Sequence, residues 1–552
     1  MTAVMQRRDF LRFSAVAAVG AGLFSMGVPY AVSAAMPEKD RLAYLSAGEQ
    51  IKLFKEGALS PADVLKAQID RINTYNGPLN TSGKELKDYM RFNGKVNAIT
   101  YEHFDEAMRA AKESEKRYKA GKARALEGLT VAIKDENDVQ GWRVTMGSVA
   151  LQDAPAAAEN AAIIDMLLSE GAVLHIQTTV PEFYIHSQTW SRLWGVTRNP
   201  WNLYYAVGGS SGGSGAALAA GFTTLATGSD MGGSIRIPAS LCGLYGFKAP
   251  FGRVPTSETT FETLGPLART FEDMVLMQNA ITGPHPKVHS SLRPKLEYPQ
   301  EYKSLKGVKI ALDYFDGWIP EGIDASIRDS LNNAAETLRS QGAVVDEVAL
   351  GWSCTQQFQT YIDGLLSTGI GAMMLAAEKY QDTMTPYARQ ALKATRNGGP
   401  EAMAAADDLA AKLHRQLQKD VFGKGYHALI MPTLATPYFP ADNDPTKDTV
   451  PINGRPVKGM CHVLTCIWNL LSRYPVADVP VGIAPNNIPM GMQVVGNTFD
   501  DLAAFQVASG YSQAGLRLYH GDLFPDFRDK ACRWRASAVP PSPASSGRDD
   551  VF

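Results

Sequence analysis

Two glycine- and serine-rich turns lie close together in an otherwise apolar part of the chain, and they constrain the fold more than any other feature. Residues 207–215 read Val-Gly-Gly-Ser-Ser-Gly-Gly-Ser-Gly and run directly into Ala-Ala-Leu-Ala-Ala. Residues 228–236 read Gly-Ser-Asp-Met-Gly-Gly-Ser-Ile-Arg. Glycine permits positive φ and lets another backbone approach closely. A flexible linker would not have such apolar flanks, so we predict two structured turns, the first between a strand at 203–207 and a helix.

Three known glycine motifs can be compared with these turns. A phosphate-binding loop requires Gly-Lys-Ser/Thr, and no lysine follows either turn. A dinucleotide fingerprint requires GxGxxG, and the third glycine is missing after residues 213–215. The nucleophile elbow GxSxG matches residues 209–213, with Ser211 at its centre. That pattern needs a later acid and histidine, and His520 is a candidate, so a histidine-dependent α/β-hydrolase esterase remains an alternative.

Composition excludes several classes of protein. The 552 residues carry a formal net charge of −2, so no excess of positive charge indicates a nucleic-acid partner. Five scattered cysteines are too few for a disulfide framework. The sequence has no CxxC pair and no HExxH, and Pro286 between His285 and His289 argues against a metal pair there. We therefore expect no metal and no other cofactor.

The N-terminus has the pattern of an export signal. Arg7 and Arg8 precede Asp-Phe-Leu-Arg, a weakly apolar run follows, and small residues stand near position 34. Paired arginines followed by Phe-Leu are typical of the twin-arginine type, which exports folded proteins. We predict that residues 1–34 are removed and that the mature protein is periplasmic or secreted, with no stable membrane span. The alternative is an N-terminal helix that stays with the fold.

Short apolar strands alternate with amphipathic helices along the chain, which predicts an α/β fold on an open, parallel or mixed sheet. One domain is expected over residues 35–535, followed by a disordered proline- and serine-rich tail at 536–552. The predicted elements are helices over much of 43–123 and at 161–170, strands at 129–134, 172–177, 428–432 and 476–481, and a helical insertion at about 355–420.

Three segments make the function more specific. Residues 208–221, 228–239 and 246–253 together resemble the amidase signature family. The resemblance covers about residues 45–520, with its core motif at about 125–275. It implies the family's fold, a large mixed or parallel central sheet covered by helices on both faces. It also implies hydrolysis of carboxamides through an acyl-enzyme, with esters or carbamates as further substrates, and no cofactor. Further segments that resemble the family are 132–135, 181–183, 195–202, 264–270, 431–433 and 489–496.

The resemblance also implies a catalytic set. Carried over by motif, it consists of Lys134 in Ala-Ile-Lys-Asp, Ser210 on a cis peptide bond, and Ser234 as the nucleophile. A serine hydroxyl needs an adjacent base, and a lysine can be that base only when neutral, a form that burial favours. Ser210 would relay the proton from Ser234 to Lys134. Without the resemblance, Lys134 beside Asp135 would be read as a surface lysine paired with acids, although a strand places Asp135 on the opposite face.

The second turn is expected to stabilise the negative charge of the tetrahedral intermediate. In the family this oxyanion hole consists of backbone N–H groups, and Ser211 is expected to support the lysine by hydrogen bonding. Asp230 and Arg236 are expected to hold the loop rather than to react. The N–H groups that correspond to the family's oxyanion hole are those of Met231, Gly232, Gly233 and Ser234.

The substrate is predicted only as a small-molecule amide. Segments 184–194 and 355–420 are the candidates for the acyl and amine pockets. The aromatic side chains of Phe183, Tyr184, Trp190 and Trp194 favour an aryl or apolar substrate or belong to the core. Residues 469–476 depart from the family's usual Asn-Leu-x-Gly-x-Pro-Ala. An exported chain would not meet tRNA, which disfavours a role in transamidation. A non-catalytic binding protein on the same scaffold is the remaining alternative, and the sequence leaves the oligomeric state open.

Overall fold

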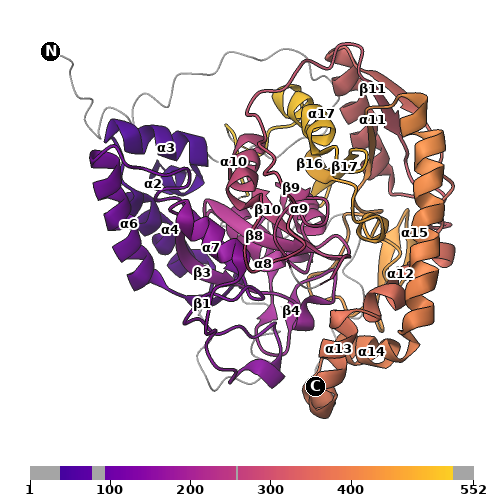
Figure 1. Ribbon diagram of the computed structural model, residues 1–552, viewed down its shortest axis with the longest axis horizontal. Helices are drawn as coiled ribbons and strands as arrows, with labels where there is room; N and C mark the ends of the chain where they lie inside the picture. Colours follow the sequence, from indigo (N-terminus) through magenta and orange to yellow (C-terminus); the bar gives the residue numbers. More distant parts are fainter. Residues whose placement is uncertain (1–37, 78–93, 257–258, 522, 526–552) are drawn as a thin grey trace.

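The computed structural model describes residues 38–77, 94–256, 259–521 and 523–525. The predicted signal at 1–34 and the predicted tail at 536–552 lie outside these residues. At the centre lies one large sheet, with the N-terminal helices at one end and a group of helices from the second half of the chain at the other (Figure 1). The predicted α/β architecture is therefore confirmed.

The described residues build the central sheet from eleven strands. β2 runs parallel to both β3 and β8, and β11 runs parallel to β12 and β13, whereas the other neighbouring pairs are antiparallel. The sheet is therefore mixed, as predicted. In spatial order its strands are β1 (Ile99–Glu102), β3 (Val173–Thr178), β2 (Thr130–Lys134), β8 (Leu225–Asp230), β10 (Thr263–Ala268), β9 (Tyr245–Lys248), β16 (Val476–Ile483), β17 (Pro489–Val495), β13 (Ala428–Pro432), β11 (Lys309–Leu312) and β12 (Val344–Glu347).

The strand predicted at 203–207 lies outside the central sheet, unlike the other predicted strands. It forms β7 (Asn202–Ala206), which pairs with β6 (Arg198–Asn199) in a separate two-stranded sheet. Two more small sheets pair β4 (Trp190–Ser191) with β5 (Gly195–Val196) and β14 (Thr449–Ile452) with β15 (Arg455–Lys458). The glycine-rich turn after β7 therefore enters the following helix from a hairpin rather than from the central sheet.

Helices flank the sheet, and their starts follow local capping chemistry. The Ser60 side chain accepts from the backbone of Asp63 in a capping box, and Pro61 occupies the first helical position. Helices cover Cys354–Asp420, which confirms the helical character predicted for 355–420. The α-helices are α2 (Glu38–Arg41), α3 (Ala47–Glu56), α4 (Pro61–Tyr75), α6 (Phe104–Lys119), α7 (Ala162–Ser169), α8 (Gly212–Ala219), α9 (Arg236–Cys242), α10 (Phe271–Ile281), α11 (Ala325–Ser340), α12 (Cys354–Leu366), α13 (Gly369–Ala376), α14 (Pro386–Ala394), α15 (Pro400–Asp420), α16 (Ile467–Leu470) and α17 (Asp501–Ala514).

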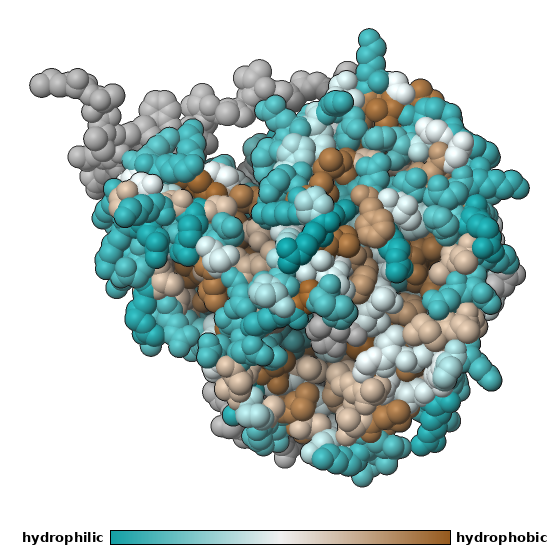
Figure 2. Space-filling view, viewed as in Figure 1, coloured by the Kyte–Doolittle hydropathy of each residue, from teal (hydrophilic) through white to brown (hydrophobic). Residues whose placement is uncertain are grey.

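The central strands are buried along their whole length. Every residue of β2, β3, β8 and β10 is buried, as expected for strands covered on both faces. Figure 2 shows hydrophilic residues over most of the viewed face, with apolar residues between them. Within the described ranges, no helix has the length and apolar character needed to cross a membrane.

One disulfide, which composition did not reveal, joins two distant segments. Cys354 at the start of α12 is bonded to Cys461, with 5.8 Å between their Cα atoms and a sequence separation of 107. Cys242 and Cys466 are buried free thiols. A single long-range bond leaves no spacing pattern in the sequence, so nothing in the chain's composition could indicate it.

Candidate active site

Lys134 lies at the end of β2 with no part of its side chain exposed. Its Nζ donates to Ser210 Oγ at 2.8 Å and to Ser229 Oγ at 2.7 Å. Its backbone N–H donates to the Thr227 side chain on neighbouring β8. The lysine is therefore buried and aimed at the two glycine-rich turns, and the alternative of a surface lysine is wrong.

The acids next to Lys134 lie on different sides of the strand. Asp135 accepts from the backbone N–H and the hydroxyl of Thr145, away from the lysine. Glu136 turns back, and its Oε2 lies 2.9 Å from Lys134 Nζ, with both side chains buried. Side chains alternate between the two faces of a strand, which explains why Asp135 points away from Lys134. Glu136 follows the end of β2 and lies in a turn, where this alternation no longer applies.

Ser210 occupies the first turn, and the peptide bond between Gly209 and Ser210 is cis, as the resemblance implies. The backbone of residues 186–188 passes directly over this turn. A Cβ on Gly209 would lie 2.7 Å from the carbonyl oxygen of His186 and 2.8 Å from the nitrogen of Gln188. Glycine is required here because the two backbones touch.

The role expected of Ser211 needs correction. Its hydroxyl donates to the backbone carbonyl of Ser229 and accepts from the Ser229 N–H, both at 3.3 Å. The side chain that contacts Lys134 is that of Ser229. Ser211 therefore supports the lysine indirectly, by holding the backbone of Ser229 in place.

Ser234 lies beside Ser210 through a backbone contact. The N–H of Ser211, the next residue after Ser210, donates to the carbonyl of Ser234 at 3.3 Å. Ser234 is half-buried, and its hydroxyl makes no hydrogen bond to the residues that the structure describes. The site thus combines a buried lysine, a buried serine bonded to it, and a second serine open to an incoming molecule.

The predicted oxyanion hole needs one correction. The N–H of Gly233 donates to Asp230 Oδ1 at 2.8 Å, so this group is already bonded. Gly233 has φ of 120°, which favours glycine, and a Cβ there would overlap the Thr465 side chain. Within the described part of the chain, the N–H groups of Met231, Gly232 and Ser234 have no acceptor. These three remain the candidates for binding an oxyanion.

Asp230 and Arg236 hold the second turn, as predicted. Arg236 Nε and Nη2 donate to the two carboxylate oxygens of Asp230 at 2.9 and 2.7 Å, and both side chains are fully buried. The same carboxylate also accepts from the N–H groups of Gly233 and Ile235. Burial alone would raise the pKa of Asp230, but the charge and hydrogen bonds of Arg236 and a hydrogen bond from Asn469 hold it below its ordinary value.

Arg236 also binds three residues from the C-terminal part of the chain. It donates to the carbonyl of Thr465 and to the side chains of Gln493 and Asn469. Asn469 in turn donates to Asp230. Asn469 itself matches the first residue of the family's usual Asn-Leu-x-Gly-x-Pro-Ala. The departure of this sequence from that pattern therefore begins after the residue that contacts the network.

Three contacts to the site could not be foreseen from the sequence. Besides Ser229, the hydroxyl of Tyr361 on α12 donates to the carbonyl of Met231 at 2.6 Å. The hydroxyl of Thr465 donates to the carbonyl of Gly232 at 2.6 Å. Ser229 is the only one inside a glycine-rich turn, where a serine could have been considered as a lysine partner.

The two predicted pocket segments meet at Tyr184. Its ring centre lies 5.8 Å from Lys134 Nζ, and its hydroxyl contacts the sulfur of Met373 on α13. The hydroxyl of Tyr387 on α14 donates to the carbonyl of Trp190 and accepts from the Glu182 N–H. Tyr184 therefore borders the lysine, whereas Phe183 and Trp190 pack into a small cluster with the helices.

The alternative of a histidine-dependent esterase does not match the geometry. His520 is exposed, whereas Ser211 is fully buried and its hydroxyl contacts the Ser229 backbone. In the described part of the chain, no histidine is hydrogen-bonded to Ser210, Ser211 or Ser234. The same residues contain no group of three or more His, Cys, Asp or Glu that could hold a metal ion.

Comparisons with known proteins agree with this geometry. The model of the Amidase family matches residues 84–504. A glutamyl-tRNA(Gln) amidotransferase chain of Carboxydothermus hydrogenoformans is 30% identical over 509 residues, which span 86% of this chain and 97% of that protein. The crystal structure of a bacterial aryl acylamidase of the amidase signature family is 29% identical with a TM-score of 0.75, covering 85% of this chain and 96% of the other. The peptide amidase of Stenotrophomonas maltophilia shares the fold at 20% identity and a TM-score of 0.70, covering 88% and 99%.

Proposed function

The chain belongs to the amidase family, and on that basis we propose that it hydrolyses carboxamides through an acyl-enzyme on Ser234. The observation that carries the proposal is the fully buried Lys134, 2.8 Å from Ser210 and beside the turn that presents Ser234. A serine hydroxyl becomes a useful nucleophile only when a base removes its proton. The proposal is supported by the hydrogen bond between Lys134 and Ser210 and by the backbone contact that joins the turn of Ser210 to that of Ser234.

The reaction follows from the order of these groups. Ser234 Oγ attacks the amide carbonyl while its proton passes to Ser210 Oγ, and the Ser210 proton passes to neutral Lys134. The tetrahedral intermediate then breaks at its C–N bond as a proton returns through Ser210 to the leaving nitrogen. Water hydrolyses the resulting ester by the same route and releases the acid. The products are a carboxylic acid and an amine or ammonia.

Backbone N–H groups would stabilise the intermediate. Met231, Gly232 and Ser234 supply the N–H groups that have no acceptor among the described residues. The buried Asp230–Arg236 pair fixes the loop before the substrate arrives. Because these donors need no reorganisation during the reaction, each contributes about 3–4 kcal/mol to transition-state stabilisation.

We propose an aryl or otherwise apolar amide as the substrate. Tyr184 borders the lysine and Met373 contacts it, so the wall nearest the base is aromatic and thioether in character. The aryl acylamidase of similar structure supports the same substrate class. Such walls bury apolar groups while a few polar atoms fix orientation.

We also propose export to an oxidising compartment. The paired arginines and the apolar run at the N-terminus have the pattern of a twin-arginine signal. The Cys354–Cys461 disulfide supports this, because such bonds persist outside the reducing cytoplasm. A cell fractionation that finds the protein in the cytoplasm with both thiols reduced would contradict the proposal.

Amidotransferase chemistry is the second candidate, and it applies only if the protein is not exported, because an exported chain would not meet tRNA. It is favoured by the similarity to the glutamyl-tRNA(Gln) amidotransferase chain along nearly the whole length of that protein. Such a chain would release ammonia from glutamine for a partner. Hydrolysis of glutamine in preference to every anilide would favour this candidate.

The test is a panel of anilides, aliphatic amides, glutamine, carbamates and esters, with purified protein and the Ser234→Ala variant. We expect anilide hydrolysis that disappears in Ser234→Ala and in Lys134→Ala, a loss of at least ~10²-fold. His520→Ala is the matched control and should keep full activity because this side chain is exposed. Activity that survives Ser234→Ala would refute the assigned nucleophile.

A further inference from the structure

Two hydroxyl groups contact the back of the loop that carries the candidate oxyanion donors. Tyr361 donates to the carbonyl of Met231 and Thr465 donates to the carbonyl of Gly232, each at 2.6 Å. Tyr361 comes from α12, and Thr465 comes from the segment that precedes α16. Neither side chain belongs to the two glycine-rich turns, so the loop is held by parts of the chain more than 100 residues away in sequence.

The geometry of the peptide bond relates each of these carbonyl contacts to the direction of the neighbouring N–H group. In a trans peptide the C=O of one residue and the N–H of the next lie in one plane and point in opposite directions. A hydrogen bond to the Met231 carbonyl therefore turns the Gly232 N–H away from Tyr361, toward the open side of the loop. The next peptide is held at both ends, by Thr465 on the Gly232 carbonyl and by Asp230 on the Gly233 N–H.

The disulfide joins the two segments that supply these hydroxyls. Cys354 begins α12, and Tyr361 lies about two helical turns further along it, on the same face. Cys461 precedes Thr465 by four residues. The bond therefore connects the segments that carry Tyr361 and Thr465 to each other.

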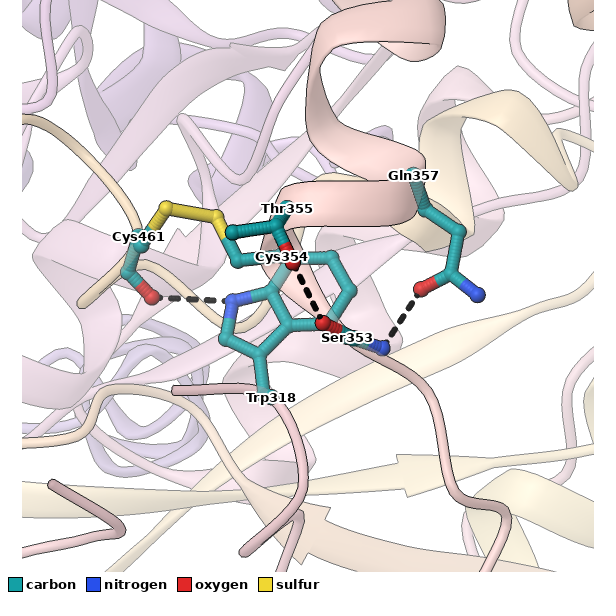
Figure 3. The surroundings of a disulfide bond; sticks show 6 residues. All are labelled: Trp318, Ser353, Cys354, Thr355, Gln357 and Cys461. Carbon is teal, nitrogen blue, oxygen red and sulfur yellow. Dashed lines mark hydrogen bonds between the residues drawn. A yellow bond between two sulfur atoms is a disulfide. The ribbon is translucent and has the colours of Figure 1, made fainter. Parts of the chain in front are cut away.

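Trp318 reinforces the same junction. Its indole lies beside the disulfide, with its N–H directed to the Cys461 carbonyl at 2.8 Å (Figure 3). Its own carbonyl accepts from the Cys354 N–H at 2.8 Å. Trp318 and Cys354 are buried, whereas Cys461 is half-buried and gives a reductant a route to the bond.

We propose that Tyr361 and Thr465 are positioning residues for the oxyanion hole, and that the Cys354–Cys461 disulfide keeps them in place, so that full activity requires the oxidised protein. The inference rests on the proposed function and adds a redox condition to it. Reduction converts the disulfide and two added hydrogens into two thiols, with the reductant oxidised in exchange. The α12 and 461–465 segments then lose their covalent link.

The first test is Tyr361→Phe, with Tyr118→Phe as the matched control. Tyr118 lies on α6, far from the loop in sequence. Its hydroxyl also donates to a backbone carbonyl, that of Glu127. We expect kcat for the best substrate of the panel to fall about 10-fold in Tyr361→Phe, the effect of one ordinary hydrogen bond and less than that of a lost oxyanion donor. KM should change little, and Tyr118→Phe should keep the wild-type kcat.

A second readout separates positioning from a loss of structure. Phenylboronic acid forms a tetrahedral adduct with an active serine, whereas the carboxylic acid product binds without one. In Tyr361→Phe, affinity for phenylboronic acid should fall in parallel with kcat while product inhibition is unchanged. Equal losses for both ligands would indicate general damage to the site and would overturn the positioning role.

The disulfide is tested by treating folded wild-type protein with tris(2-carboxyethyl)phosphine, which becomes its phosphine oxide. Alkylation of two additional cysteines verifies the reduction. We expect a lower kcat and faster amide hydrogen exchange at residues 230–234. The Cys354→Ser/Cys461→Ser variant should start from the lower kcat and not respond to the phosphine.

The outcomes distinguish this inference from the proposed function. If Ser234→Ala remains active, the nucleophile is wrong. If Ser234→Ala is inactive but Tyr361→Phe keeps the wild-type kcat, the positioning role alone is wrong. If reduction leaves both kcat and hydrogen exchange at the loop unchanged, the disulfide does not support the loop and the redox condition is overturned.

Discussion

A buried lysine beside the active-site network makes a quantitative prediction about stability and pH. Lys248, on β9, is 1% exposed, and its Nζ donates to the carbonyls of Tyr474 at 2.8 Å and Ser472 at 3.3 Å. Burial, reinforced by the charge of Arg236 and opposed by the carboxylates of Asp230 and Asp501, lowers the pKa of Lys248 to about 7. The folded protein therefore holds this proton less tightly than the unfolded chain does.

The sign of the effect follows from proton linkage. Between about pH 7 and pH 10 the unfolded chain binds a proton at this lysine that the folded protein has released, so the free energy of unfolding rises with pH. One proton contributes about 1.36 kcal/mol per pH unit where the difference is complete. From pH 6 to pH 9, Lys248 should raise the free energy of unfolding by about 2–3 kcal/mol.

Lys248→Met removes the titration and keeps the length of the side chain. The variant leaves two carbonyls without their donor, a cost of about 1–3 kcal/mol that does not depend on pH. Urea unfolding of both proteins at pH 6 and pH 9 gives the difference in free energy at each pH. We expect Lys248→Met to lose about 2–3 kcal/mol of stability relative to the wild type on going from pH 6 to pH 9. A difference that is the same at both pH values would refute the reasoning, since every other titrating group is shared.

Three further substitutions test the site. Ser229→Ala should lower kcat/KM about 10-fold because Lys134 loses a partner at 2.7 Å, whereas Ser214→Ala, which removes a buried hydroxyl that does not contact the lysine, should not. Gly209→Ala places a Cβ 2.7 Å from the His186 carbonyl and should cost about 1–3 kcal/mol in thermal or urea unfolding, together with most of the activity. Asp230→Asn leaves the buried Arg236 without its counter-charge and should cost about 3–5 kcal/mol in urea unfolding, while the circular dichroism spectrum of the folded variant stays that of the wild type.

Much of the fold could be predicted because its signals are local. The strands at 129–134 and 428–432 are short apolar runs, and the Ser60-Pro61 start of a helix carries its own cap. The mixture of parallel and antiparallel strands is harder to predict from local sequence signals. Which strands become neighbours depends on contacts between residues far apart in sequence, and the strand at 203–207 has the right local pattern but pairs in a hairpin outside the sheet.

The candidate catalytic residues could be named from the sequence because they lie inside the two unusual turns and one strand. The contacts around them could not, because they come from elsewhere. The Tyr361 hydroxyl and the Cys354–Cys461 bond depend on how α12 packs against the loop after β15. The Gly233 N–H shows a further limit of prediction from a sequence motif. The motif indicates which backbone N–H groups lie near an oxyanion, but not that one of them already donates to Asp230.

The two polar networks of the site use different cations, and the difference fits their tasks. Lys134 contacts two hydroxyl groups and one carboxylate, partners that can exchange protons with it. Arg236 binds Asp230 through two parallel hydrogen bonds and reaches three carbonyl-type acceptors beyond it. An arginine does not release its proton and its planar group fixes a carboxylate in one orientation, whereas a buried lysine can act as a base. The networks meet where the Ser211 N–H donates to the Ser234 carbonyl. The proposed nucleophile therefore belongs to the loop that Arg236 and Asp230 hold, and this loop is bonded to the turn that carries Ser210.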